Sequence, residues 1–348
     1  MIMKRKLEND ESALSDVIGM VMLLAMIVIV LSSTMIILQP YISDYDDNKN
    51  WSQAKVIADQ IDERIRLVGS SPQDTGSIQT FELASTSISN LDSAEVWTIS
   101  GDVSGFDVVE VELSSFNSVN IKSMNNTATY AIVNNGGNIT THTLNLEENT
   151  EMVNVNFDSY VDKLLIVEIY NTNDIIIHKF VRLELSGIGI DTALSTGNFD
   201  IDLMNGARLE KLSDEAYKVT RYPSLRHFSM PDDSQQLSFV LVDVDMSLLS
   251  GTSSPFSLQM ISEGPLTLFD GDVRNIRMKM TNEIDESMTD RYMSYWIEDY
   301  NLNLASGTVD TFEGLGPWKR VSGIDGISIH PLEKSVLTEI VLHRVVIK

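Results

Sequence analysis

The residue types most often used in catalysis and metal binding are few and widely spaced in this chain. Its 348 residues include no cysteine, which excludes thiol catalysis, disulfides and cysteine-ligated metals. No two histidines lie within one helical turn of each other, so the sequence contains no helical zinc pair. The histidines are His142, His178, His227, His330 and His343. We expect His178 and His343, which fall in strand patterns, to be ordinary sheet residues.

The glycine motifs of catalytic and phosphate-binding loops are also missing. The chain has neither a Gly-x-Ser-x-Gly nucleophile turn nor a Gly-x-x-x-x-Gly-Lys-Ser/Thr loop. Gly187-Ile188-Gly189 begins like a dinucleotide-binding loop, but Thr192 stands in the place of the last glycine and no helical pattern follows. We therefore expect no enzymatic activity and no cofactor.

Calcium is the better-motivated ligand, because alternating acid and amide side chains resemble the start of a helix-loop-helix site: Asp44, Asp46, Asn48 and Asn50. However, Lys49 stands where the sharp turn requires glycine, and Lys55 stands where the closing glutamate belongs, which excludes the standard loop. In so acidic a chain, we expect the other acidic pairs to be solvated: Asp200/Asp202, Asp243/Asp245 and Asp270/Asp272. No metal site is predicted.

Three Asn-x-Ser/Thr sequons begin at Asn50, Asn125 and Asn138. This number is no more than chance gives in a chain so rich in asparagine, serine and threonine. They are candidate N-glycosylation sites if the segments that carry them are exported.

The charge balance limits the partners of this chain. Lys and Arg number 25 against 50 Asp and Glu, a formal net charge of −25. Such a chain repels nucleic acids and anionic membrane surfaces, so we expect no nucleic-acid partner. The excess of acid fits an exported protein in salty surroundings, where ions screen its self-repulsion.

The elements that must position everything else begin with a long apolar segment near the N-terminus. Residues 17–43 carry no charge, and as a helix Val17 to Leu38 would be about 33 Å long, close to the roughly 30 Å hydrocarbon core of a bilayer. Representative positions of this predicted membrane helix are Val17, Ile18, Gly19, Leu24, Ile27 and Leu31. A basic cluster, Lys4 to Lys6, precedes it and acidic residues follow it. Because basic residues prefer the cytoplasmic side, this predicts a cytoplasmic N-terminus and an extracellular remainder.

Two general interpretations of this segment are a cleaved secretory signal and a plain single-pass anchor. Against a signal, the apolar part is long, acidic residues separate it from the basic cluster, and Met35 to Leu38 continue it beyond the small residues Ser32 to Thr34.

A third, more specific interpretation comes from the entry into the helix. Ala13-Leu14-Ser15-Asp16-Val17-Ile18-Gly19 resembles the N-terminus of archaeal type IV pilin-like proteins, with Asp16 where proline is common in that family. The resemblance implies that a prepilin peptidase cuts between Ala13 and Leu14. It also implies that the mature helix contacts other pilin subunits when the protein assembles. Asp16 would then lie close enough to the new helix start to cap it.

A second helical pattern follows the membrane segment. Pro40 predicts a kink or a stop, because proline removes a backbone donor and clashes with the preceding turn. Beyond a polar stretch, apolar residues recur at spacings of three and four and predict one buried face of a helix: Trp51, Ala54, Ile57, Ile61, Ile65 and Val68. Gly69 to Pro72 predict its end.

The remainder predicts a mainly β, antiparallel, sandwich-like region. Asn134 to Asn138 and Asn171 to Asp174 are turn sequences between strand patterns. We expect strands at 107–113, 129–133, 139–146, 164–170, 175–185, 237–244, 274–280 and 336–347. The small residues of 186–198 predict a flexible loop. We expect one helix near 287–300, with Met288, Tyr292, Tyr295 and Trp296 on its packed face.

These patterns combine into the following organisation: a leader (1–13), a transmembrane or pilin core helix (14–40), an amphipathic helical extension (41–72) and two β-rich domains (73–190 and 191–348). We expect a non-enzymatic protein of the cell membrane, single-pass, with its C-terminal region extracellular. Its expected partners are the lipid bilayer, prepilin peptidase and possible pilin neighbours. Because the region after the helix is large, a minor or accessory pilus subunit for adhesion or surface contact is favoured over a major one. The alternative is an anchored extracellular binding or sensing domain that does not assemble.

Overall fold

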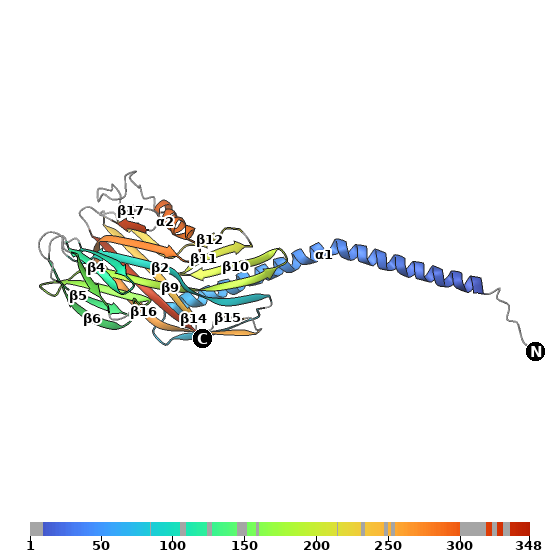
Figure 1. Cartoon of the computed structure of the whole chain (residues 1–348), viewed down its shortest axis with the longest axis horizontal. Coiled ribbons are helices and arrows are strands. Elements are labelled where there is room, and N and C mark those ends of the chain that lie inside the picture. Colours follow the sequence, from blue (N-terminus) through green and yellow to red (C-terminus); the bar gives the residue numbers. More distant parts are fainter. Residues whose placement is uncertain are drawn as a thin grey trace, which may run out of the picture.

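In the computed structural model, a long helix extends away from one end of a β-rich head (Figure 1). The structure describes residues 10–83, 85–104, 109–123, 127–144, 152–157, 160–213, 215–230, 234–246, 250–251, 255–299, 318–321, 326–329 and 335–348. The predicted coarse fold, one long apolar N-terminal helix followed by a mainly β region, is confirmed.

The elements follow one another in this order: α1 (Asp10–Gly69), β1 (Gly76–Phe81), β2 (Thr86–Asp102), β3 (Val109–Ser115), β4 (Ser118–Ser123), β5 (Ala128–Asn135), β6 (Asn138–Thr143), β7 (Val153–Asn156), β8 (Leu164–Asn171), β9 (Ile176–Leu194), β10 (Gly197–Met204), β11 (Ala207–Leu212), β12 (Lys218–Arg221), β13 (Leu225–Ser229), β14 (Gln235–Met246), β15 (Ser250–Gly251), β16 (Phe256–Asn282), α2 (Ser287–Asp299), β17 (Trp318–Val321), β18 (Gly326–Ile329) and β19 (Val336–Ile347).

Helix α1 is continuous, which excludes the stop that was one of the two outcomes predicted at Pro40. Pro40 lies inside the helix, so the segments predicted as 14–40 and 41–72 form one element of 60 residues, about 90 Å long. A proline removes a single intrahelical donor, and the rest of the helix tolerates that loss here. The helix also starts at Asp10, before the predicted cleavage point, so Asp16 lies inside it and is not its cap in the uncut chain.

The head is built mainly on one large sheet, whose central path runs β12-β11-β10-β9-β2-β16-β19-β14-β13. The two predicted hairpins are confirmed, because β5 pairs with β6 and β8 pairs with β9 in antiparallel register. A separate sheet of three strands has the order β3-β4-β7. One pairing between described strands departs from the antiparallel expectation: β14 and β19 are parallel over their whole length.

Long strands of the large sheet contribute to two hydrophobic cores, one on each face. In β14, Leu237, Phe239 and Leu241 pack in the core beside α2, whereas Val242 and Val244 pack in the core beside α1. Successive side chains of a strand point to opposite faces, so the change from odd to even positions means that β14 contributes one face to each core. Strands β9 and β19 also contribute residues to both cores in this way. A third core lies between the three-stranded sheet and strands β5, β8 and β9.

Most of the predicted loop, residues 186–194, and the domain boundary predicted at 190 and 191 lie inside strand β9, and the rest forms the turn to β10 and its first two residues. Ile188 and Ile190 are fully buried in the core beside α1. The glycines serve close packing here: a Cβ on Gly187 would lie 2.5 Å from the Leu203 carbonyl oxygen, and one on Gly189 would lie 2.8 Å from the Ser89 hydroxyl. Strand pairing therefore runs without a break across the predicted boundary at residues 190 and 191.

Helix α2 lies against the sheet and confirms the predicted helix, apart from residue 300, which lies outside the described residues. Met288, Tyr292 and Trp296 are buried, as expected for its packed face. Tyr295 is 37% exposed, which corrects its assignment to that face, and its ring stacks on Tyr222 at the edge of the contact.

Candidate functional site

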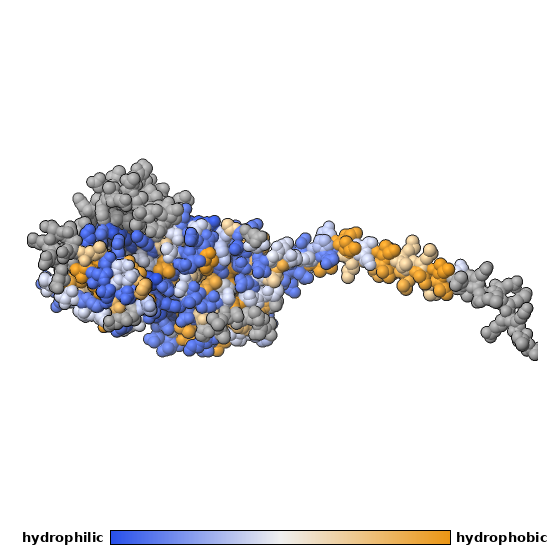
Figure 2. All heavy atoms as spheres, viewed as in Figure 1, coloured by the Kyte–Doolittle hydropathy of each residue, from blue (hydrophilic) through white to orange (hydrophobic). Residues whose placement is uncertain are grey.

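The N-terminal half of α1 presents an apolar surface that touches nothing else in the structure. Every described side chain from Ser15 to Ile42 is exposed, and the large apolar ones between Val17 and Ile42 are 45% to 73% exposed. All six representative positions of the predicted membrane helix lie on this rod: Val17, Ile18, Gly19, Leu24, Ile27 and Leu31. Figure 2 shows the contrast between this hydrophobic rod and the largely hydrophilic head. By length and composition alone, α1 is able to cross a bilayer.

Hydroxyl groups within the apolar rod bond to the backbone of their own helix. Ser33 Oγ donates to the Ile29 carbonyl at 2.7 Å, and Thr34 Oγ1 donates to the Val30 carbonyl at 2.8 Å. Such i−4 bonds leave no unmet hydroxyl donor, and they are the usual way in which serine and threonine fit into apolar helices.

The C-terminal half of α1 is embedded in the head by one apolar face. Ala54, Ile57, Ala58, Ile61, Ile65 and Val68 are at most 4% exposed, which confirms the predicted face. Trp51, at the outer end of this face, stacks on Phe199 of β10 with ring centroids 3.4 Å apart. Strands β9, β10, β16 and β19 supply the opposing surface.

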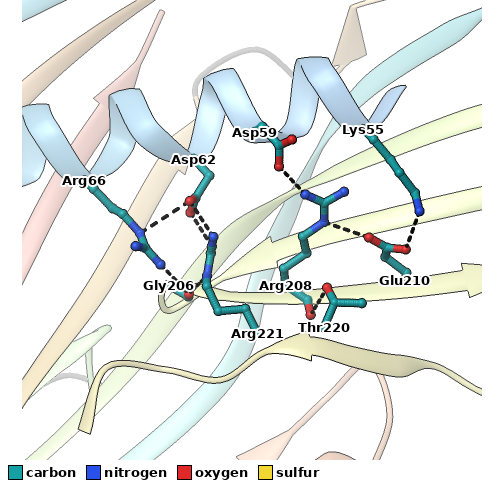
Figure 3. Close-up of polar contacts among 9 residues, drawn as sticks. All are labelled: Lys55, Asp59, Asp62, Arg66, Gly206, Arg208, Glu210, Thr220 and Arg221. Atoms are coloured by element: carbon teal, nitrogen blue, oxygen red, sulfur yellow. Dashed lines mark hydrogen bonds and ion pairs between the residues drawn. The ribbon is translucent and has the colours of Figure 1, made fainter. Parts of the chain in front are cut away.

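A row of ion pairs joins the flank of this face to strands β11 and β12 (Figure 3). Arg208 of β11 pairs with Asp59 and, at 2.9 Å, with Glu210, whose other oxygen lies 3.3 Å from Lys55 Nζ. Negative and positive side chains therefore alternate along the contact, in the order Asp59, Arg208, Glu210 and Lys55. The first and last belong to α1 and the middle two to β11.

The second half of the row centres on Asp62 and Arg221. The guanidinium of Arg221 donates two hydrogen bonds to the Asp62 carboxylate, at 2.5 and 2.6 Å. Arg66 lies 3.3 Å from the same carboxylate, and both arginines donate to the Gly206 carbonyl oxygen. Burial lowers the pKa of Arg221, and the neighbouring Asp62 carboxylate acts in the opposite direction. A bidentate pair of this kind fixes orientation as well as position.

A polar contact also holds α1 at the point where it leaves the head. Asp47 accepts hydrogen bonds from the backbone N–H of Ser195, at 2.9 Å, and from its hydroxyl, in the turn between β9 and β10. Between this contact and the apolar rod, Tyr41 and Tyr45 are each 70% exposed.

The residues of this junction were not singled out in the sequence. The available signal was the spacing of Asp59 and Asp62, which places two acids beside the apolar face of a helix. In a chain with half as many basic as acidic residues, such acids on a buried flank favour basic partners on the opposing strands. The sequence could not show that these partners are Arg208 and Arg221.

The remaining predicted site residues are scattered. Ala13 and Leu14 lie in the helical backbone of α1, and residues 1–9 of the leader lie outside the described residues. Among the sequons, Asn50 is half-buried inside α1 and Asn138 is exposed at the start of β6, whereas Asn125 lies outside the described residues.

The acidic pairs and histidines form no metal site in the part of the chain that the structure describes. The strand register places Asp191 opposite Asp200. Burial of the Asp202 carboxyl, together with the negative charges of Asp200 and Asp191, raises its pKa to about 7. His178 Nδ1 lies 2.7 Å from Asp102 Oδ1 in a fully buried pair that sequence spacing did not reveal. Its Nε2 has no hydrogen-bond partner, so no nucleophile adjoins this pair among the described residues.

Comparison with known proteins adds no relative: no family model matches the chain, and no curated protein or solved structure matches it.

Proposed function

We propose that this chain is a single-pass membrane protein of the archaeal type IV pilin-like class, in which α1 anchors a non-enzymatic extracellular head. One observation carries the proposal: a single continuous helix is apolar and wholly exposed over its first half and embedded in the head over its second. An exposed apolar surface of this size requires lipid or protein around it.

Three features favour a bilayer as the resting environment of the rod. Its length matches the hydrocarbon core. Ser33 and Thr34 satisfy their own donors inside it. Tyr41 and Tyr45 then stand where an aromatic belt contacts lipid headgroups, and Lys4 to Lys6 favour a cytoplasmic N-terminus.

The rigid junction favours an assembling subunit over a passive tether. In an assembly, the apolar rod leaves the lipid and packs among helices of other subunits, because lipid and a helix bundle are similar solvents for Val, Ile, Leu and Met. The ion pairs of Figure 3 would then set the angle of each head on its rod. Prepilin peptidase, by the resemblance of residues 13–19, would remove the leader, and the large head fits a minor or accessory subunit that serves adhesion or contact.

The absence of cysteine permits a direct test with single-cysteine variants in native cells. Lys218→Cys, at an exposed position of strand β12, should react with a membrane-impermeant maleimide in intact cells. Lys6→Cys, in the leader, should react only after lysis; it is followed in the uncleaved precursor, because cleavage between Ala13 and Leu14 removes it. Equal reaction of both in intact cells, or of neither, would overturn the topology.

Assembly is tested separately by cross-linking through the rod. Ile27→Cys should give dimers with a short bismaleimide, and the protein should appear in sheared surface fibres. Lys218→Cys serves as the matched control, because a head surface need not meet its copy. Correct topology without rod cross-links or fibre material would leave the alternative, an anchored binding or sensing domain.

A further inference from the structure

Glu95 of β2 is a carboxylate enclosed in the core beneath α2. Its residue exposure is 0%. Trp97 Nε1 donates to its Oε2 at 2.8 Å, and Asn205 Nδ2 donates to the same oxygen at 3.0 Å. Oε1 has no hydrogen-bond partner. No described basic residue forms an ion pair with Glu95, which is unusual for a buried acid.

The side of α2 that faces Glu95 also carries unmatched polar atoms. Tyr292 and Trp296 are at most 1% exposed, and neither the Tyr292 hydroxyl nor the Trp296 indole nitrogen has a hydrogen-bond partner. The Trp296 ring lies 5.9 Å from that of Trp97 and 6.1 Å from that of Tyr292. Burial and the nearby Glu95 charge raise the pKa of the Tyr292 hydroxyl. The Tyr292 hydroxyl therefore lies near the Glu95 carboxylate without a well-formed hydrogen bond to it.

Burial disfavours a charge on Glu95, and this effect outweighs the hydrogen-bond donors around it, which favour the charge. Its close neighbours are neutral donors: Trp97 on its own strand, Asn205 in the β10–β11 turn, Tyr292 on α2 and Asn282 at the end of β16. The other titratable groups near Tyr292 are Tyr222, before β13, and the buried Asp202 of β10. Arg291, also on α2, is directed to the Tyr217 carbonyl oxygen. Burial raises the pKa of Glu95 to about 7.

We propose that Glu95 is a proton-operated latch for α2: when protonated it holds the helix on the sheet, and when ionised it weakens that attachment. The protonated carboxyl gains an O–H that it can donate to the Tyr292 oxygen, so both groups find partners. The ionised carboxylate brings an unpaired charge into a core with no cation beside it, and an opening of α2 lets water reach it.

The direction of the pH dependence follows from linkage. The pKa of Glu95 is higher with α2 closed, about 7, than its ordinary value of 4.5. The closed form therefore binds the proton more tightly, so its advantage is complete at low pH and falls as the pH rises. The loss occurs between these two values and levels off above the higher one.

The test is hydrogen exchange of residues 287–299 in the full-length protein in detergent micelles, corrected for the intrinsic pH dependence of amide exchange. Protection of α2 should fall by up to about tenfold per pH unit between roughly pH 5 and 7 and then level off. Glu95→Gln, which stays neutral, should remove this slope. Asp202→Asn is the matched control, because it removes a second buried carboxyl and should leave the slope in place.

Two results would overturn the latch. One is a flat pH profile of α2 in the wild type; the other is an unchanged slope in Glu95→Gln. If Glu95→Gln does not fold, infrared difference spectra of the Asp202→Asn variant between pH 5.5 and 8.5 replace it, because the buried Asp202 carboxyl of the wild type ionises in the same range. They should show a buried protonated carboxyl that ionises near pH 7, and its absence would equally contradict the proposal.

Discussion

Arg221 is the residue that most directly fixes α1 in the head. It joins three structural elements: its guanidinium binds both oxygens of Asp62 on α1 and the Gly206 carbonyl of the β10–β11 turn, while its backbone belongs to β12. The Asp62 side chain is only 11% exposed, so it has little water to replace this partner. An arginine suits the position because its planar fork matches a carboxylate in a way that lysine does not.

Arg221→Met should therefore destabilise the head by about 2 kcal/mol, less than the figure for a fully buried pair, because the Arg221 side chain is 31% exposed. The stability of Arg221→Lys should lie between those of the wild type and Arg221→Met. Urea unfolding in micelles, followed by tryptophan fluorescence, measures the change. Lys218→Met on the same strand is the control and should stay within about 0.5 kcal/mol of the wild type. Equal effects of Arg221→Met and Lys218→Met would remove the ion pair from the account.

At the scale of elements, α1 has two surfaces with different solvents. The face from Ala54 to Val68 packs on the sheet, whereas the rod from Val17 to Ile42 has no protein around it. Because the packed face and the rod belong to one helix, we expect a force applied to the rod to be transmitted to the head.

The packed face can be tested with two matched alanine substitutions on α1. Ile61→Ala deletes a fully buried side chain and should cost about 3 kcal/mol of unfolding free energy. Val56→Ala, in the same helix but 53% exposed, should change it by no more than about 0.5 kcal/mol. The same urea titration compares them. A small loss for Ile61→Ala would mean that α1 is not held by its apolar face.

Many of the helices and strands could be predicted from the sequence. An element with one buried face repeats its apolar residues at a regular spacing. The packed face of α1 and the strand at 274–280 were predicted from such periods, and the hairpin at residues 134–138 from its turn residues. A stop at Pro40, one of the two predicted outcomes, was wrong because a long helix tolerates one missing donor. The loop at 186–198 was wrong because Gly187 and Gly189 signal close contact between strands as readily as flexibility.

The candidate site was predictable only in part, for a related reason. The apolar rod is local in sequence, so its residues were found together. The junction and the Glu95 latch depend on pairs far apart in the chain, such as Asp62 with Arg221 and Glu95 with Tyr292. Those pairs exist only once the order of strands is known. Strand order is set by non-local contacts that a single sequence does not display.

At the scale of the whole molecule, the structure separates a hydrophobic rod from a largely hydrophilic head (Figure 2). The formal charge of −25 keeps heads apart in dilute salt and is screened in salty surroundings. In the proposed assembly, copies of the chain would meet through the rod, since it carries no charge from Val17 to Ser43.

The most direct test of the membrane-anchored, pilin-like account is the location and N-terminal sequence of the protein isolated from its native cells. The account predicts a protein in the membrane or fibre fraction whose first residue is Leu14 and which keeps the whole rod. A freely soluble cytoplasmic protein that still begins at Met1 would contradict it.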